Sequence, residues 1–192
     1  MGNYVGLTGT PGTGKKTLAP LVASKMGLPC ISLYDQAVSS RLIKRDDDDA
    51  EVDTLALNKF LVGHMSRPAL IHGHLLPYVL EGRDVTKVAV LRCEPKALKQ
   101  RLLNRGYQRE KVVENVEAEL IGVVSADSFT VFGSKKTAEF DTTAPDQTAA
   151  VKAISEFLQG SRRPGPRIDW TFDYGSAYKL RSLLSLRGTS PT

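Results

Sequence analysis

The sequence contains few cysteines, few aromatic residues and no long apolar run. Two of its 192 residues are cysteines, and 7% are aromatic, including a single tryptophan. Two cysteines exclude a disulfide-rich scaffold. The lack of about 18 consecutive apolar residues excludes an ordinary membrane-spanning helix. The first residues run directly into an apolar segment and do not resemble a signal peptide, so we expect a globular protein in the cytoplasm that does not interact with a membrane.

The two cysteines carry no predicted chemistry. Cys30 and Cys93 each lie in a segment that predicts a buried strand. Free thiols in such segments behave as small apolar side chains. We therefore expect two reduced cysteines in the core rather than a disulfide.

Positive charge is concentrated near the end of the chain. The formal net charge is +5, and residues 160–192 contain six basic and two acidic residues, which leaves +1 for the rest. Glycine and proline cluster where the charge changes, in "GSRRPGPR". A chain of this length most often makes one domain, and we expect that domain at 1–159 with a basic extension at 160–192.

Short apolar segments alternate with segments of helical periodicity. The predicted strands are "NYVGLTG", "LPCISL", "ALIHGH", "KVAVLRC" and "AEFDTT". The predicted helices span residues 15–26, 34–43, 54–66, 94–106, 107–124 and 144–158. Apolar strands separated by helices indicate a parallel sheet covered on both faces. The sequence predicts a three-layer α/β fold with about five parallel strands.

"GTPGTGKKTL", residues 9–18, follows the first predicted strand and opens the first helix. Glycines at these positions let backbone N–H groups converge on phosphate oxygens, while a lysine neutralises them. The phosphate-loop pattern G-x-x-x-x-G-K-[ST] requires a hydroxyl after the lysine, but Lys16 stands there. The candidate nucleotide-binding residues of the loop are Gly9, Pro11, Gly12, Thr13, Gly14, Lys15, Lys16 and Thr17. A coincidental glycine-rich turn is the alternative.

Arg101 and Arg105 are four residues apart in a predicted helix, so both side chains leave from one face. The planar guanidinium binds phosphate oxygens in pairs. After a phosphate loop, we interpret this pair as a second phosphate contact. Two arginines on a solvated helix face remain the alternative.

The loop and the arginine pair belong to a longer signature. "VLRCEPKALKQRLLNRGYQREKVVENVEAEL", residues 90–120, closely resembles the lid of the archaeal and nuclear adenylate kinase isoenzyme six family. That lid reads V-L-R-x-x-P-x-x-L-x-x-R-L-x-x-R-G-Y, followed by K-x-x-E-N-x-x-x-E. The resemblance covers residues 1 to about 158, including "GTPGTGK" and "DTT", and "IDW" in the tail is similar to archaeal members. The loop is also similar to the nucleoside monophosphate kinase form G-x-P-G-x-G-K-G-T, in which the threonine stands where Thr17 does here.

The resemblance implies a P-loop kinase that transfers phosphoryl from ATP to AMP, often with slow ATPase activity, and a link to maturation of the small ribosomal subunit. By position, Lys15 would hold the phosphates and Arg101 would lie against the adenine or the phosphates. Arg105 would stabilise the transferring group. The AMP-side insertion is expected at about 33–66 and the lid at about 105–119.

The metal motif of the family is broken. The family has a carboxylate and a histidine two residues apart after the third strand, and the acid holds hydrated Mg²⁺. Here His74 fits the histidine, but His72 replaces the acid. Because Mg²⁺ prefers oxygen ligands, we expect Lys16 and His72 to weaken a metal held through water, and we assign no metal ligand. We expect His74 to join the phosphate or water network; polar residues at a strand end and a transition-metal site are the alternatives.

Two further segments of the AMP side are less informative. The acidic run at 46–49 is most simply a solvated loop. Arg41 is the nearest arginine to an AMP phosphate, and we assign it no firm role.

Two other functions remain open. One is a nucleotide-gated ribosome assembly factor with residual catalysis, and the other is a different small-molecule kinase, such as one for shikimate or gluconate. The tail mixes basic residues with Trp170, Phe172, Tyr174 and Tyr178, a composition typical of nucleic-acid contacts. We expect it to bind rRNA or a small-subunit ribosomal protein and to be dispensable for nucleotide chemistry. A packed or frayed extension is the alternative.

Overall fold

The computed structural model describes residues 4–45 and 50–185. Five strands form one parallel sheet in the order β2-β5-β1-β6-β7. The strands are β1 (Tyr4–Thr8), β2 (Cys30–Ser32), β5 (Leu70–His72), β6 (Val85–Arg92) and β7 (Thr137–Asp141). The predicted fold class and all five strand assignments are confirmed. The predicted loop at 46–49 lies outside the described residues.

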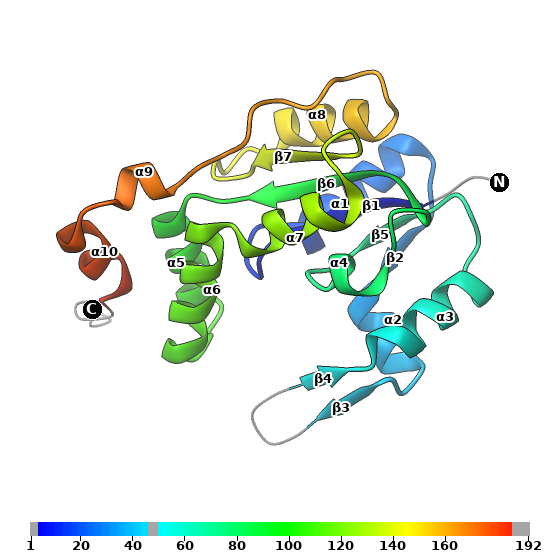
Figure 1. Cartoon of the computed structure of the whole chain (residues 1–192), viewed down its shortest axis with the longest axis horizontal. Coiled ribbons are helices and arrows are strands. Elements are labelled where there is room, and N and C mark those ends of the chain that lie inside the picture. The colour runs from blue at the N-terminus through cyan, green and yellow to red at the C-terminus, as the bar shows by residue number, and fades with distance from the viewer. Residues whose placement is uncertain (1–3, 46–49, 186–192) are drawn as a thin grey trace.

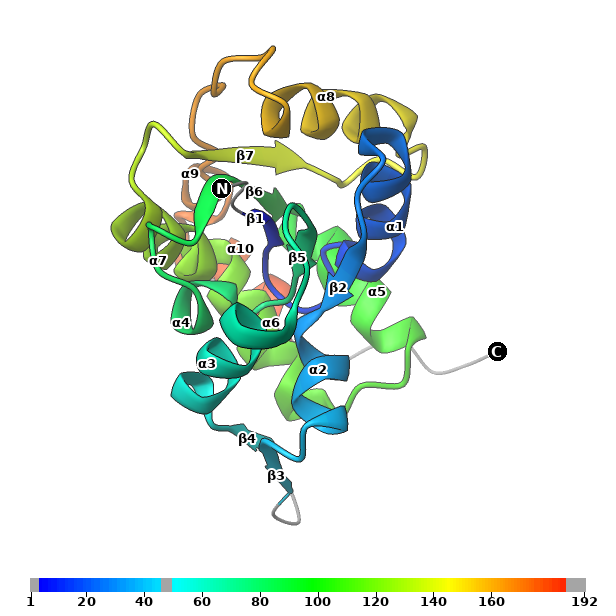
Figure 2. The ribbon, with the colours of Figure 1, turned by 90° about the vertical axis from the view of Figure 1, so that its right-hand side faces the viewer.

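Helices cover both faces of the sheet (Figure 2). On one face, Leu18 and Val22 pack with Ile154 and Phe157 over the central strands. On the other face, Leu57, Leu76 and Phe132 belong to a second cluster. The covering helices are α1 (Lys15–Met26) and α8 (Thr148–Leu158) on the first face, and α3 (Thr54–His64), α4 (Leu76–Val79) and α7 (Val123–Phe132) on the second. This arrangement makes three layers.

A helical pair continues beyond the carboxyl end of β6. Helix α5 (Pro95–Asn104) begins as predicted, because the Glu94 side chain accepts hydrogen bonds from two backbone N–H groups of the first turn. It packs against α6 (Arg109–Ile121) through a third apolar cluster that includes Leu98, Leu102 and Val116. Helix α6 is shorter than the helix predicted at 107–124. It ends at Ile121 because Gly122 adopts the left-handed conformation, with φ 70°.

The tail lies against this helical pair (Figure 1). Its helices are α9 (Thr171–Tyr174) and α10 (Ala177–Leu184). Leu183 is buried in the third cluster, and Trp170 and Tyr174 pack against the same cluster. For residues 168–185, the structure therefore agrees with the alternative of a packed extension.

The expected AMP-side insertion contains α2 (Leu33–Ser39), a two-stranded antiparallel sheet and α3. The small sheet pairs β3 (Ile43–Arg45) with β4 (Ala50–Val52). The predicted helix at 34–43 was wrong in its second half, because Arg41 takes a left-handed φ of 57° and the chain turns into β3. None of the described helices is long and apolar enough to cross a bilayer.

The two cysteines differ in environment. Cys93 is buried, as predicted, whereas Cys30 is exposed. The prediction for Cys30 was wrong because β2 is an edge strand of the sheet, where one side of the strand has no neighbour. Both thiols are free, as expected.

A buried ionic group joins β6, β7 and α6. Arg92 donates from Nε to Glu119 Oε1 at 2.8 Å and from Nη1 to Glu139 Oε1 at 2.5 Å. The three side chains are between 1% and 3% exposed. Charges withdrawn from water to this degree are stable only when they are paired and fully hydrogen-bonded. This group therefore fixes where α6 lies relative to the sheet.

Candidate active site

The phosphate loop connects β1 to α1, and two of its glycines are required by close packing. A Cβ on Gly9 would lie 2.4 Å from the Leu91 carbonyl oxygen, and one on Gly12 would lie 2.6 Å from Leu98 Cδ1. Both glycines have positive φ, 140° and 94°, which glycine adopts without strain. The loop is therefore seated directly on the end of β6 and on α5.

Hydrogen bonds from the segment after β7 hold the loop from behind. Thr142 Oγ1 donates to the Thr13 carbonyl oxygen at 2.7 Å, and Thr142 is buried. The Thr13 hydroxyl in turn donates to the Thr10 carbonyl oxygen at 2.8 Å. These bonds explain the place of "DTT" in the signature, because its first threonine supports the loop backbone.

The Lys15 ammonium lies over its own loop. Its Nζ donates to the carbonyl oxygens of Gly9 at 2.5 Å and Thr10 at 2.9 Å. Removal from water lowers the pKa of Lys15 to about 7, with Glu119 acting in the opposite direction and Arg105 in the same one. A group with this pKa is charged below neutrality and gains a proton when it binds phosphate at higher pH.

Two cavities meet at Lys15. One, of about 560 Å³, is bordered by the loop residues Gly12, Gly14 and Thr17 and by Arg105 and Tyr107. It has the position and polarity of a donor-phosphate site, since loop backbone and cations surround it. We call it the donor cavity.

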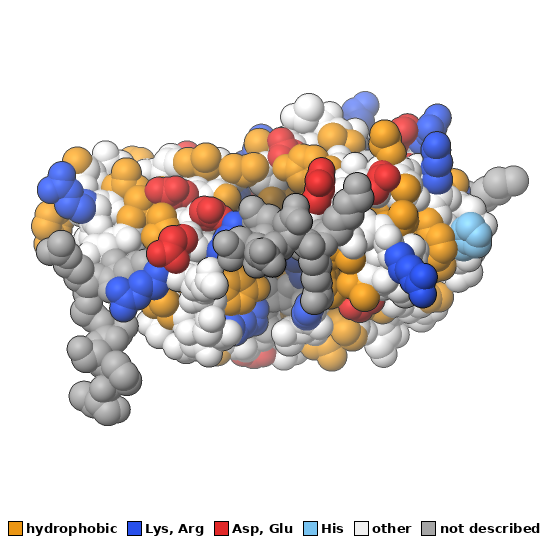
Figure 3. Space-filling view, turned by 90° about the horizontal axis from the view of Figure 1, so that it is seen from below, with side chains coloured by type: hydrophobic (Ala, Val, Ile, Leu, Met, Phe, Trp, Pro, Cys, Tyr) orange, Lys and Arg blue, Asp and Glu red, His pale blue; other side chains and the backbone are white. Residues whose placement is uncertain are grey.

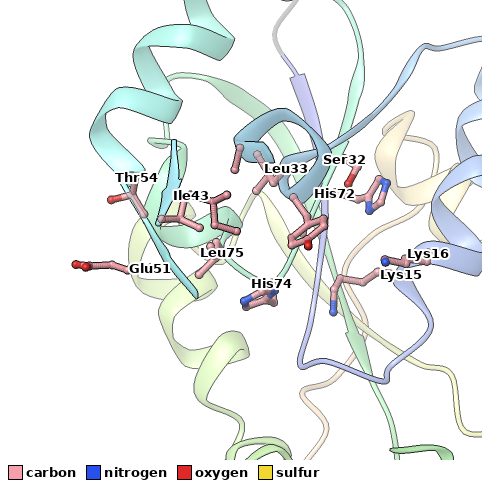
Figure 4. Close-up of a pocket in the computed structure, with 14 residues that line it drawn as sticks. Lys15, Lys16, Ser32, Leu33, Ile43, Glu51, Thr54, His72, His74 and Leu75 are labelled. Carbon is pink, nitrogen blue, oxygen red and sulfur yellow. The ribbon is translucent and has the colours of Figure 1, made fainter. Parts of the chain in front are cut away.

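The second cavity, of about 470 Å³, lies between the sheet edge and the AMP-side insertion. Leu33, Ile43 and Leu75 form its apolar middle, as Figure 4 shows. Glu51 and Thr54 lie at the end away from Lys15, and their polar atoms point away from Lys15 and His74. We call it the acceptor cavity.

Of the residues that the structure describes, four border both cavities: Lys15, Lys16, Tyr34 and His74. Lys16 Nζ lies 5.7 Å from the centre of the Tyr34 ring, within the range of a cation–π contact. The shared border is the point at which a group bound in one cavity faces a group bound in the other. Tyr34 was not identified from the sequence, because only the fold brings the start of α2 to the phosphate loop.

The two histidines occupy different places. His72 is the last residue of β5, and His74 follows the strand. Burial lowers the pKa of His74 to about 4, assisted by the charge of Lys15. Burial also lowers the pKa of His72, with Lys15 and Lys16 adding to the effect and Asp35 opposing it. Both imidazoles are therefore neutral near pH 7. His74 borders both cavities, and its part in a phosphate or water network stays a prediction.

Arg101 and Arg105 do not point into one cavity. Arg105 borders the donor cavity, and its predicted contact with phosphate stays a prediction. Arg101 instead donates from Nη2 to the carbonyl oxygens of Thr142 and Thr143, at 2.7 and 2.9 Å. The helix ends at Asn104, so Arg105 is the capping residue that follows it and not part of α5. A role for Arg101 beside the adenine stays a prediction.

The two side chains that stand where the family favours Mg²⁺ do not fit a metal held by the protein. No group of three or more histidine, cysteine or acidic side chains among residues 4–45 and 50–185 could hold an ion. The positions expected to favour Mg²⁺ carry an ammonium, Lys16, and an imidazole, His72. Because Mg²⁺ requires oxygen ligands, these side chains offer it neither ligands nor negative charge.

Comparisons with known proteins agree with this geometry. Residues 5–122 match the AAA domain family. The chain is 35% identical over 173 residues to a putative adenylate kinase of Thermococcus gammatolerans, covering 88% of this chain and 94% of that protein. It is 30% identical over 178 residues to a putative adenylate kinase of Methanocaldococcus jannaschii, covering 88% and 96%.

Solved structures share the fold. A shikimate kinase from Bacteroides thetaiotaomicron aligns with a TM-score of 0.53 at 18% identity, covering 82% of this chain and 96% of that chain. A gluconokinase from Sinorhizobium meliloti aligns with a TM-score of 0.52 at 18% identity, covering 82% and 95%. At this level of identity, the likeness concerns architecture.

The position of Lys15 predicts that ATP binding depends on the positive charge of the Lys15 ammonium group. Lys15→Ala should weaken ATP binding at least about tenfold, since a lost hydrogen bond to a charged group costs about 1.5 to 3 kcal/mol. Because the pKa of Lys15 is about 7 before binding, wild-type protein should take up a proton when it binds ATP at about pH 8. Calorimetry in two buffers of different ionisation enthalpy measures both quantities. Lys25→Ala, on the exposed side of the same helix, is the control, and unchanged affinity of Lys15→Ala would contradict the assignment.

Proposed function

The chain belongs to the adenylate kinase-like family of P-loop proteins, and on this premise we propose that it transfers the terminal phosphoryl group of ATP to AMP, forming ADP from both. ATP would occupy the donor cavity, with its phosphates on the loop. AMP would occupy the acceptor cavity, with its phosphate toward Lys15 and His74. A slow ATPase activity would accompany the transfer.

The observation that carries this proposal is the chemistry of the shared border. Among the described residues, those that border both cavities are two lysines, a tyrosine and a histidine, and none is a carboxylate. A sugar hydroxyl must lose a proton to attack, which calls for a general base, and His74, with a pKa of about 4, is a weak one. A phosphate monoester is already largely ionised at neutral pH. The border therefore favours a phosphate acceptor over the alcohol acceptors of shikimate and gluconate kinases.

The site must also bind the negatively charged phosphates of both substrates close together. Phosphoryl transfer depends mainly on positioning and on electrostatic stabilisation of the moving group. Lys15 and Arg105 flank the donor cavity, and Lys16 lies between the two substrates. His74, neutral because its pKa is about 4, can donate one ring N–H to a phosphate oxygen without adding charge.

The proposed reaction predicts AMP-dependent formation of ADP. In a coupled assay with ATP, adding AMP should raise ADP formation well above the level with ATP alone, because AMP supplies an ionised acceptor. CMP and UMP serve as comparison substrates. Weak hydrolysis that AMP does not change would support the ribosome assembly factor instead. Turnover only with shikimate or gluconate would support a different small-molecule kinase.

Kinases of this kind are expected to receive ATP together with Mg²⁺. In this chain, Lys16 and His72 stand where the family favours the metal, and both border the acceptor cavity. We infer that the cationic side chains offset much of the phosphate charge and that the protein contributes little to holding the ion. The consequence is nucleotide binding with weak Mg²⁺ dependence and slow phosphoryl transfer.

Restoring oxygen ligands should restore the metal requirement. The double variant Lys16→Thr with His72→Glu should turn over faster and with a sharper Mg²⁺ dependence, because one cation is removed and one carboxylate is added. Steady-state rates across a Mg²⁺ titration measure this effect, and Lys25→Thr on the same helix is the control. Rapid wild-type turnover with a strict Mg²⁺ requirement, unimproved in the double variant, would contradict the idea of a compromised metal site.

A second function, in maturation of the small ribosomal subunit, is favoured by the outer surface of the tail. Phe172 and Tyr178 are 90% and 83% exposed. Lys179 and Arg181 are exposed beside them on α10, and Figure 3 shows basic and hydrophobic side chains together at the left end, where α10 lies. Aromatic rings that stack on bases, next to cations that contact phosphates, are typical of single-stranded nucleic-acid sites.

This surface predicts salt-dependent RNA binding. Phe172→Ala combined with Tyr178→Ala should reduce binding of a single-stranded RNA oligonucleotide several-fold, since stacking contributes about 1 to 3 kcal/mol per base. Binding by the wild type should weaken as salt rises. Leu55→Ala, at an exposed apolar residue of α3 that is 77% exposed, is the control. Equal RNA binding by the wild type and the double variant would refute this function.

A further inference from the structure

The Glu119 carboxylate connects the tail to the phosphate loop. Its Oε1 accepts a hydrogen bond from the Trp170 indole Nε1 at 3.3 Å. Its Oε2 accepts one from Thr10 Oγ1 at 2.6 Å. The Glu119 side chain is 1% exposed, so water does not compete for either bond. A residue of the tail and a residue of the loop therefore share one carboxylate.

Thr10, the loop residue bonded to Glu119, also contacts Lys15. The Thr10 carbonyl oxygen accepts a hydrogen bond from Lys15 Nζ at 2.9 Å. Glu119 also acts on Lys15 through its charge, which opposes the lowering of the Lys15 pKa. A change in the position of Glu119 thus reaches Lys15 by two routes, through the Thr10 backbone and through space.

Hydrogen bonds hold the tail to the rest of the protein both before and after Trp170. Before it, the Ile168 N–H donates to Glu139 Oε2 at 2.6 Å, and the Ile168 carbonyl oxygen accepts from Arg92 Nη1 at 3.1 Å. After it, Lys99 Nζ donates to the carbonyl oxygens of Leu183 and Ser185 at 2.7 and 2.6 Å. Trp170 therefore keeps a fixed position relative to the core and to α5.

Trp170 is suited to orienting Glu119 rather than to neutralising it. The charge of Glu119 is met by Arg92, and its Oε1 also accepts from the Cys93 N–H at 2.9 Å. A partly buried indole N–H needs an acceptor, and this acceptor is the oxygen opposite the one that holds Thr10. The bond from Trp170 thus restricts rotation of the carboxylate about its last side-chain bond.

We propose that the segment from Ile168 to Ser185 is part of the nucleotide site, and that Trp170 is a positioning residue that acts through Glu119 and Thr10 to place Lys15 on the phosphates. The sequence alone favoured a tail that nucleotide chemistry can do without. The contacts of the tail favour the opposite. The inference rests on the proposed function only in taking ATP as the ligand.

A double-mutant cycle tests the connection. Trp170→Phe keeps the aromatic packing and the Arg92 ion pair but removes the N–H donor, and Thr10→Val removes the hydroxyl at nearly constant shape. We expect Trp170→Phe to weaken ATP binding about threefold and Thr10→Val about tenfold, the range of single lost hydrogen bonds. In the Thr10→Val background, Trp170→Phe should have almost no further effect. Thr10→Ser, which restores the hydroxyl, should restore that effect.

A merely structural role would give a different result. Trp170→Phe would then weaken ATP binding by the same factor in both backgrounds, in step with a loss of thermal stability, and this additivity would overturn the inference. Ile121→Ala, at an exposed residue of the helix that carries Glu119, should leave ATP affinity unchanged. A wild-type protein that binds no ATP would refute the proposed function and the inference together, whereas normal binding with an additive cycle refutes only the inference.

The single tryptophan of the sequence gives a measurement that needs no change at Trp170. All intrinsic tryptophan emission therefore comes from Trp170 and reports changes in the surroundings of its ring, including the hydrogen bond to Glu119. ATP binding should change that emission in the wild type, because Lys15 leaves the Thr10 carbonyl for the phosphates and the hydrogen bonds of Glu119 readjust. The change should be lost in Thr10→Val at saturating ATP. Wild-type emission that saturating ATP does not alter would count against the connection.

Discussion

One arginine between two buried carboxylates constrains most of the molecule. Arg92 meets Glu119 and Glu139 where almost no water reaches, and removing one partner from such a group typically costs about 3 to 5 kcal/mol. The arginine supplies one positive charge for two acids, so other donors must satisfy the remaining oxygens. Ser125 and the Ile168 N–H serve Glu139. The phosphate loop, α6, the last strand and the tail therefore converge on one ionic group.

The sequence predicts the sheet well because a parallel sheet hides both faces of its strands. Such strands appear as short, wholly apolar runs, and all five were recognised. It predicts the AMP side poorly, because the turn after α2 is made by Arg41 at positive φ, with no glycine to mark it. The paired strands β3 and β4 have three residues each, too few for an alternating pattern. These features depend on tertiary contacts rather than on local preference.

The phosphate loop could be identified from its own residues, because glycine spacing and a lysine before a helix report a local geometry. The ionic group could not. Arg92 lies 27 residues from Glu119 and 47 from Glu139, and only the fold brings them together. Glu119 was visible as the last acid of "ENVEAE", but nothing in that spacing shows that it turns inward. Arg101 shows a further limit of the sequence. Helical spacing places it with Arg105, but its guanidinium donates to the Thr142 and Thr143 carbonyl oxygens, whereas Arg105 borders the donor cavity.

The common wall of the two cavities has a consequence for how kinase and ATPase activities relate. Under the proposed function, whatever AMP leaves unfilled in a space of about 470 Å³ is open to water, and that water would lie against the lysines proposed to hold the donor phosphates. Hydrolysis would then be, under the proposed function, a side reaction in which water replaces AMP as the acceptor, and it would require no additional residues. The enzyme and the nucleotide-gated switch would, under the same proposed function, be two regimes of one site, selected by how often AMP is present when ATP binds.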